Sequence, residues 1–263
     1  MTEKPSSPPF VWARRYVEKL GLALVPIEPG EKFPKGNGWN QPGGYITDPA
    51  QAEAFWRQHP RHNMGVVLGP SRVCSMDVDD VPATRLVLAD LLGMDLDAMA
   101  DQYPTVVGNP ERFRVLFSLP EGVELSRHSL SWPHKDDPDG SRFKGLMASA
   151  KAAKDAGDAA GEASARAAAD LIKRFTVVEL RAGLVQDVLP PSIHPGTQKP
   201  YAWRTGPTKE GFPVLPQALL AALMAALGPL LQRLRPPLVL VQGDTVSAFA
   251  GALAAAYAAV PVA

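Results

Sequence analysis

The sequence predicts a fold of the mixed α+β class, in which helices pack against β-sheets. Residues 10–20 place apolar side chains at helical spacing, whereas residues 112–119 alternate charged and apolar side chains as a half-buried strand does. Other strand-like and helix-like segments follow one another along the chain, without an internal repeat. The two spacings together therefore indicate sheets that are covered by helices.

Length and composition limit the class of protein. The 263 residues suggest one large or two small domains, and 27 basic residues balance 27 acidic ones, so no polybasic tail announces a nucleic-acid partner. A single cysteine, Cys74, rules out an internal disulfide framework and fits a reducing cytoplasm. The N-terminus has no signal-peptide pattern, and the apolar segment 218–231 is interrupted by Gly228 and Pro229. We therefore expect a cytoplasmic protein without a transmembrane segment.

The N-terminal part alternates helix and strand. A helix over residues 10–20 stops at Gly21, a strand follows over 22–27, and Asp48 or the residue before it caps a helix over 49–58. Between them lies a Gly/Pro-rich loop that carries three residues of interest: Lys32, Lys35 and Trp39. Such a loop can lay lysines against phosphates and a ring against a base, or it can be a surface loop whose tryptophan fills the core.

The centre of the chain predicts a hairpin that ends in acids. Residues 66–68 and 73–76 are short apolar strands, and residues 69–72 have turn composition. The second strand runs into Asp77-Val78-Asp79, and because side chains alternate along a strand, both aspartates share one face. They repel each other unless a cation such as Mg²⁺ or Mn²⁺ lies between them. The alternative is that these acids, together with Asp80, form a solvated strand end.

Residues 82–92 are predicted to be a helix beneath the acids, and residues 105–107 a strand. The strand over 112–119 puts Arg112 and Arg114 on one face, either as solvent-side charges or as an anion clamp. Residues 120–143 are predicted to be irregular.

An Ala-rich segment over residues 148–174 predicts a lightly packed helical insertion, either one long helix or a pair broken near Gly157 and Gly161. Strands are predicted over 175–180, with Glu179 near the end, and over 185–189 and 201–204. A rigid Pro-rich loop separates the last two. The composition becomes helical from residue 212 onward.

Three carboxylates, those of Asp77, Asp79 and Glu179, thus come near the ends of sheet strands. If they converge, they can hold two divalent ions, which would clamp the attacking and leaving oxygens of a phosphoryl transfer. Arginines on the strand between them would hold triphosphate oxygens through bidentate hydrogen bonds.

The order of these segments resembles the primase-polymerase (Prim-Pol) family of the archaeo-eukaryotic primase superfamily, best known from plasmid, phage and mobile-element replication proteins. The resemblance covers residues 10–204. It rests on five segments in the same order: Pro-Gly-Glu-Lys-Phe-Pro and Gly-Trp at residues 29–39, Asn-Met-Gly-Val and Met-Asp-Val-Asp at 63–79, Arg-Phe-Arg-Val-Leu-Phe at 112–117, Val-Glu-Leu-Arg-Ala-Gly at 178–183, and Leu-Pro-Pro-Ser-Ile-His-Pro and Tyr-Ala-Trp at 189–203.

The resemblance implies an RRM-like mixed or antiparallel sheet as catalytic core, with an added N-terminal α/β module. It implies that Asp77 and Asp79 match the family's paired metal-binding acids, and that Glu179 matches the third, usually an aspartate. The implied reaction is template-dependent nucleotidyl transfer from a dNTP or NTP to a 3′-hydroxyl, with two Mg²⁺ or Mn²⁺ ions and release of pyrophosphate.

This sequence departs from the family pattern at one position and matches it less closely at several others. Many members carry a histidine where Arg114 stands; an arginine cannot act as a general base but can hold a phosphate. Ser192 and His194 resemble the superfamily's Ser-x-His nucleotide motif, although they follow the third acid rather than precede it. Lys144 and Arg181 are further candidates for contacts with template or phosphate.

The expected organisation is a catalytic domain over residues 1–204, with the helical insertion at about 145–174. Residues 205–263 are expected to be a helical extension that could lead to a helicase region; no Walker-type motif lies in this chain, so no helicase motor is encoded. The expected partners are a single-stranded DNA template, its primer, and a helicase. Two alternatives stay open: a metal-dependent nuclease and a non-catalytic replication module that binds single-stranded DNA.

Overall fold

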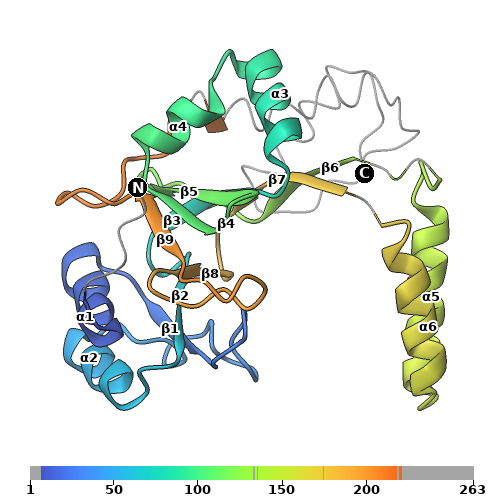
Figure 1. The fold of residues 1–263 in the computed structure, drawn as a ribbon, viewed down its shortest axis with the longest axis horizontal. Helices are drawn as coiled ribbons and strands as arrows, with labels where there is room; N and C mark the ends of the chain where they lie inside the picture. Colours follow the sequence, from blue (N-terminus) through green and yellow to red (C-terminus); the bar gives the residue numbers. More distant parts are fainter. Residues whose placement is uncertain (1–6, 133, 135, 174, 218, 221–263) are drawn as a thin grey trace. The chain divides into compact units, whose positions relative to one another are not determined.

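The computed structural model describes residues 7–132, 134, 136–173, 175–217 and 219–220. The chain divides into two compact units, which are described separately. Unit 1 comprises residues up to His128 and from Glu179 onward, and unit 2 comprises Ser129–Val178. Figure 1 shows the helices and strands of both. Helices and antiparallel sheets are both present, which confirms the mixed α+β class.

The helices of unit 1 begin and end where the sequence places caps. Helix α1 (Pro9–Leu20) ends at Gly21, whose left-handed backbone allows its N–H to reach the carbonyls of the last turn. Helix α2 (Pro49–Gln58) begins at Asp48, whose Oδ1 accepts a hydrogen bond from the Gln51 N–H at 2.7 Å, as predicted.

Two more helices follow the acidic segment. Helix α3 (Val81–Leu92) is capped by Asp80, whose carboxylate accepts the Ala83 N–H at 2.7 Å. Asp80 is therefore a helix cap rather than a third acid of the strand end. A short helix, α4 (Leu96–Gln102), follows and is likewise capped by an aspartate.

A small antiparallel sheet has the order β1-β2-β8, formed by β1 (Leu24–Ile27), β2 (Asn63–Val67) and β8 (Gln186–Leu189). All residues of β2 and β8 are buried. A core cluster of unit 1 joins this sheet to its helices and includes Tyr16 of α1 and Trp56 of α2. This sheet and its two helices correspond to the predicted N-terminal α/β part, with a strand added from late in the chain.

A larger antiparallel sheet carries the acids. Its strands in unit 1 follow the order β3-β5-β4-β9: β3 (Val73–Val78), β5 (Arg112–Ser118), β4 (Thr105–Asn109) and β9 (Ala202–Thr205). The end of β7 (Phe175–Arg181) lies on the other side of β3. The finer RRM-like description of this sheet stays a prediction.

The predicted hairpin over residues 66–76 is wrong. Residues 69–72 do form a turn, with the Arg72 N–H donating to the Gly69 carbonyl at 3.0 Å, but the flanking strands belong to different sheets. Strand β2 has β1 and β8 as its two neighbours, and β3 has β5 and β7, so neither has a free edge for the other. Turn composition shows that the chain changes direction but not which strands pair.

The connection β2–β3 lies against the connection β7–β8. The Leu68 N–H donates to the Val185 carbonyl at 2.9 Å, and the Gly69 N–H donates to the Gly183 carbonyl at 2.7 Å. A Cβ at Gly69 would lie 3.1 Å from the Gly183 carbonyl carbon, so the two backbones approach closely. Two of the passages of the chain between the sheets therefore run along one hydrogen-bonded seam.

Unit 2 contains the Ala-rich segment as two helices, α5 (Ser141–Asp155) and α6 (Ala159–Asp170), which lie side by side (Figure 1). The predicted break near Gly157 is confirmed, whereas Gly161 lies inside α6. The prediction of irregular structure over 120–143 missed strand β6 (His128–Trp132), which neighbours β7.

The predicted C-terminal helical extension is only partly described. Residues 206–216 are irregular and carry two buried residues, Phe212 and Leu215. Residues 221–263 lie outside the described part of the chain, as does most of the apolar segment 218–231. Within the described residues, no helix combines the length and the hydropathy needed to span a bilayer.

Candidate functional site

The two aspartates share one face, as predicted. Val78 is fully buried, whereas Asp77 and Asp79 are partly exposed. Both carboxylates line a cavity of about 110 Å³ in unit 1. Strands β4 and β5 and two loops supply the other lining residues, which are Lys32, Val106, Gly108, Asn109, Arg112, Phe113, Arg114, His194 and Tyr201.

Each aspartate is paired with an arginine of β5. Asp77 lies opposite Arg114 in the β3–β5 register, and its Oδ2 accepts a hydrogen bond from Arg114 Nη2 at 3.0 Å. Arg112 Nη1 lies 3.4 Å from Asp79 Oδ1. Because residues two apart on a strand face the same side, the two acids on one strand lie opposite the two arginines on the other. The predicted arginine face of β5 is thus directed at the acids.

The charges in the cavity perturb one another. Burial, followed by the neighbouring Asp77 carboxylate, raises the pKa of Asp79, and the Arg112 guanidinium acts in the opposite direction. Burial lowers the pKa of Lys32, and the guanidinium groups of Arg112 and Arg114 lower it further. The cavity thus holds a partly desolvated acid beside a crowded group of cations, so both signs of charge lie close together.

His194 contributes a polar edge to the same cavity. Its Nδ1 accepts hydrogen bonds from the N–H groups of Gly196 and Thr197, both at 3.1 Å. Nδ1 is therefore unprotonated in the neutral ring, and the proton is carried by Nε2. Burial, then the charges of Lys32 and Arg112, lower the pKa of His194, which favours this neutral form. The imidazole also packs on Tyr201, with ring centroids 5.3 Å apart.

Glu179 is buried in β7 and is held by two arginines. Arg127 Nε donates to its Oε1, and Arg181 Nη1 donates to its Oε2 at 2.7 Å. It does not line the cavity of the aspartates. Arg181, predicted as a template or phosphate contact, is instead used inside the protein, where it also donates to Asp187 at 2.7 Å.

Asp187 is a charged residue of the site that the sequence-based prediction missed. It lies in β8 and is 1% exposed, and its Oδ2 accepts a hydrogen bond from Ser75 Oγ at 2.5 Å. Arg114 Nε lies 3.4 Å from the same oxygen. Although burial opposes ionisation, Arg114 and Arg181 lower the pKa of Asp187 overall. An acid within the apolar segment 185–189 is the signal that could have revealed it, since aspartate is rarely buried without a cationic partner.

These contacts form one chain of alternating charges. Acids and arginines follow each other across strands of both sheets in the order Asp77, Arg114, Asp187, Arg181, Glu179 and Arg127. The predicted third acid is therefore connected to the aspartate pair through arginines and a buried aspartate.

The donor atoms of the aspartate pair fit a hard divalent cation. Asp77 and Asp79 present carboxylate oxygens on one side of the cavity, and such oxygens are the ligands that hard divalent cations prefer. Both oxygens of Glu179 are occupied by arginines. Within the described residues, no three His, Cys, Asp or Glu side chains gather as a ligand set. That all three acids share metal ions stays a prediction.

The other predicted contact residues divide between the cavity and the rest of the structure. Lys32 lines the cavity, but Lys35 pairs with Glu28 at 2.6 Å. Trp39 packs against a small buried cluster beside β1, which fits the structural alternative for this loop. Lys144 lies on α5, in unit 2.

Ser192 is separated from His194 by the structure. Its Oγ accepts a hydrogen bond from the Met64 N–H at 2.8 Å and thereby fastens the loop after β8 to β2. It lines a different cavity, of about 400 Å³. The predicted pair from the Ser-x-His motif is therefore not brought together around the aspartates.

Comparison with known proteins identifies the class. The family model for Prim-Pol, described as bifunctional DNA primase/polymerase, N-terminal, matches residues 13–218, so the chain belongs to this family. Membership implies an enzyme of the DNA primase/polymerase type, with DNA and nucleotides as substrates.

Two further comparisons add nothing to this assignment. A model for UDP-N-acetylglucosamine 2-epimerase matches residues 215–263, which is a small part of the chain and lies almost wholly outside the described residues. It carries no functional argument. No curated protein matches the chain.

Proposed function

We propose that the protein is a template-dependent DNA primase/polymerase whose nucleotidyl transfer takes place in the cavity of Asp77 and Asp79. The observation that supports this most is the pairing of two strand-end acids with several cations in one small cavity of a Prim-Pol domain. A nucleoside triphosphate bound with a divalent ion needs both signs of charge at close range.

In the proposed reaction, the 3′-hydroxyl oxygen of a primer attacks the α-phosphorus of an incoming dNTP or NTP. A new oxygen–phosphorus bond forms, the bond to the bridging oxygen breaks, pyrophosphate leaves, and the hydroxyl proton is lost to solvent. In priming, an initiating nucleotide replaces the primer. Base pairing with a single-stranded template selects the nucleotide.

The cationic side chains would bind the triphosphate. Lys32 and Arg112 direct charge at the cavity, and the Nε2–H of His194 is a neutral hydrogen-bond donor beside them. Because charge-assisted hydrogen bonds to phosphate are stronger than neutral ones, we assign most of the binding free energy to Lys32 and Arg112. His194 would orient the triphosphate rather than move a proton.

Arg114 has a different task. Only 18% of its side chain is exposed, and its guanidinium is engaged by Asp77 and Asp187. It would hold the Asp77 carboxylate in place, so we treat it as a positioning residue. Asp187, Arg181 and Glu179 continue this support across strands β8 and β7.

Mg²⁺ or Mn²⁺ would be held by Asp77 and Asp79, with Glu179 as the predicted third acid. Two such ions would neutralise the charge of the triphosphate and activate the attacking hydroxyl.

We further propose that the protein acts in the cytoplasm of a bacterium, in replication of a plasmid, phage or mobile element. A helicase is the proposed replication partner.

The test is synthesis on a defined single-stranded template with Mg²⁺ or Mn²⁺, with and without a primer, using labelled dNTPs and NTPs. We expect elongated products from the wild-type protein and none from Asp77→Asn/Asp79→Asn. A matched control is Asp155→Asn, which removes an exposed acid of α5. Shortened DNA without incorporation would indicate a nuclease. Synthesis that survives the double substitution would contradict the proposed site.

A further inference from the structure

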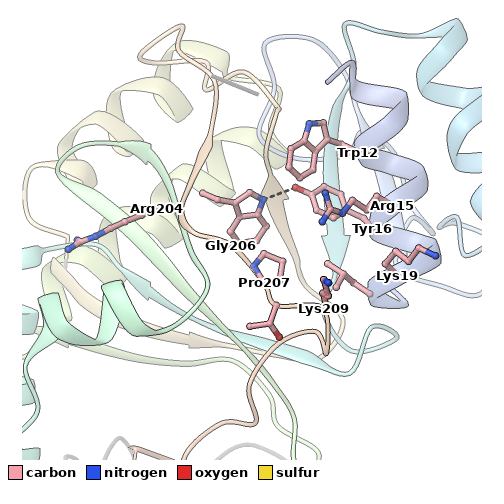
Figure 2. A pocket seen from close by; sticks show the side chains of 11 residues that line it. Trp12, Arg15, Tyr16, Lys19, Arg204, Gly206, Pro207 and Lys209 are labelled. Carbon is pink, nitrogen blue, oxygen red and sulfur yellow. Dashed lines mark hydrogen bonds between the residues drawn. The ribbon is translucent and has the colours of Figure 1, made fainter. Parts of the chain in front are cut away.

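A second and larger cavity of unit 1 has features of a nucleotide-binding site. Its volume is about 810 Å³, within the range of small-molecule sites. Figure 2 shows that it lies between helix α1 and the segment that runs from Arg204 to Lys209. It shares no lining residue with the cavity of the aspartates. Its lining residues are Trp12, Arg15, Tyr16, Lys19, Leu20, Trp203, Arg204, Gly206, Pro207, Thr208 and Lys209.

Aromatic rings held in fixed positions form one part of the lining. The Tyr16 hydroxyl donates to the Pro190 carbonyl at 2.8 Å and accepts a hydrogen bond from Trp203 Nε1 at 2.9 Å. Trp12 packs on Tyr16 with ring centroids 5.5 Å apart. Tyr16 is 1% exposed, whereas Trp12 and Trp203 are only partly buried. The buried tyrosine therefore orients two indole rings that retain accessible surface.

The charge of the lining is entirely positive: it contains four basic side chains and no acid. Arg204 is neutralised by Asp101 at 2.7 Å and points away from the cavity in Figure 2. Lys19 has a neighbouring glutamate at 3.4 Å. Arg15 and Lys209 have no carboxylate partner among the described residues. Two uncompensated cations thus line the same cavity as the two indoles, and the Arg15 guanidinium lies 5.9 Å from the Trp12 ring centroid.

We propose that this cavity binds one nucleotide unit, with the base against the indole rings of Trp12 and Trp203 and the phosphate at Arg15 and Lys209. Proteins bind single-stranded nucleic acids with this combination: aromatic side chains stack on the bases, and cationic side chains contact the phosphate backbone. A free nucleotide and a nucleotide within a DNA strand offer the same chemistry. The proposal goes beyond the aspartate site and does not depend on its catalytic role.

Charge reversal tests the phosphate contacts. We compare Arg15→Glu/Lys209→Glu with Lys154→Glu/Lys173→Glu, a control that makes the same change in net charge on exposed residues of unit 2. The affinity for a fluorescent oligothymidylate is measured by anisotropy in EDTA, which removes divalent ions from the aspartate site. We expect at least about tenfold weaker binding for the first variant and no more than about a twofold change for the control. The slope of log affinity against log salt should become shallower by about 0.7, as expected when one phosphate of a single strand is no longer neutralised.

Photo-crosslinking locates the bound base without any substitution. An oligonucleotide with one 5-iodouracil is irradiated on the wild-type protein, and the crosslinked peptides are identified by mass spectrometry. We expect crosslinks at Trp12 or Trp203. Competition by dTTP would indicate a free-nucleotide site, whereas competition by unlabelled oligonucleotide alone would indicate a strand site; both support the proposal.

Crosslinks confined to other peptides, together with unchanged affinity of Arg15→Glu/Lys209→Glu, would overturn it. Loss of synthesis in Asp77→Asn/Asp79→Asn leaves these binding measurements unaffected. The failure of either proposal can therefore be recognised separately.

Discussion

Arg114 and Asp187 belong to different sheets, yet Arg114 Nε lies 3.4 Å from Asp187 Oδ2. The same arginine donates from Nη2 to Asp77 at 3.0 Å. A single guanidinium thus connects a buried acid of the small sheet to an acid of the candidate site. Burying charges costs free energy unless each is paired, so the position of the Asp77 carboxylate depends on strand β8 as well as on its own strand.

Asp187→Asn should therefore lower the free energy of unfolding by about 3–5 kcal/mol, because it leaves the buried Arg114 and Arg181 without their shared acid. The measurement is denaturant unfolding at pH 7. Asp155→Asn is the control, since it removes an exposed acid that pairs with Lys151 and should change stability by less than about 0.5 kcal/mol. Equal stability of the wild type and Asp187→Asn would show that this network does not stabilise the fold.

The pH dependence of stability should reveal the same residue. The pKa of Asp187 is lowered in the folded protein, so its contribution is present above the unfolded pKa of about 3.9 and is lost as pH falls through the folded value. The stability difference between the wild type and Asp187→Asn should shrink as pH drops below about 4. A difference independent of pH would instead indicate a packing effect.

Asp79→Asn should separate activity from stability. Its pKa is raised by burial and by Asp77, so above the folded pKa the charged carboxylate disfavours folding. At pH 7 the variant should be as stable as the wild type or more stable, and this gain should vanish as pH falls below about 4. Nucleotide incorporation should fall about a hundredfold or more, because a proposed metal ligand is lost. A stable variant with full incorporation would remove Asp79 from the site.

Lys32→Gln should raise the KM for the incoming triphosphate about tenfold, since one charge-assisted hydrogen bond to phosphate is lost. The matched control is Lys35→Gln in the same loop, because Lys35 pairs with Glu28 and Glu31 outside the cavity. Steady-state incorporation kinetics compare the two. Equal KM values for both variants would place the triphosphate away from Lys32.

Gly108→Ala should displace the Tyr201 ring. A Cβ at this position would lie 2.1 Å from Tyr201 Cε1, so the ring that packs on His194 must move. We expect a loss of about 1–3 kcal/mol of stability together with reduced incorporation. Gly145→Ala, where a Cβ meets nothing within 4 Å, should not lower stability. Adding Tyr201→Ala should relieve the clash, so additive losses in the double variant would contradict this explanation.

The sequence was informative where structure depends on neighbouring residues. Alternation along a strand placed Asp77 and Asp79 on one side of β3, and Arg112 and Arg114 on one side of β5, as the structure has them. The cap at Asp48 was likewise predictable, since an aspartate before a proline-led helix satisfies the first N–H groups locally. Prim-Pol membership also followed from the order of local motifs.

The errors concern contacts between distant parts of the chain. The turn after β2 could not reveal that β1 and β8 already occupy both edges of that strand. Lys32 and Lys35 lie in one loop of uniform composition, and only its folded path separates them. Asp187 was predicted only as part of a strand because two of its partners, Ser75 and Arg114, lie far away in sequence.

The hydrogen-bonded seam between the connections at residues 68–72 and 182–185 has a mechanical consequence. Two hydrogen-bonded backbones that cross together resist bending more than a single one would, because bending one strains its hydrogen bonds to the other. Lys32 and His194 come from loops of the small sheet, whereas the aspartates belong to the large one. We therefore expect the width of the opening between them to stay nearly constant when a ligand binds.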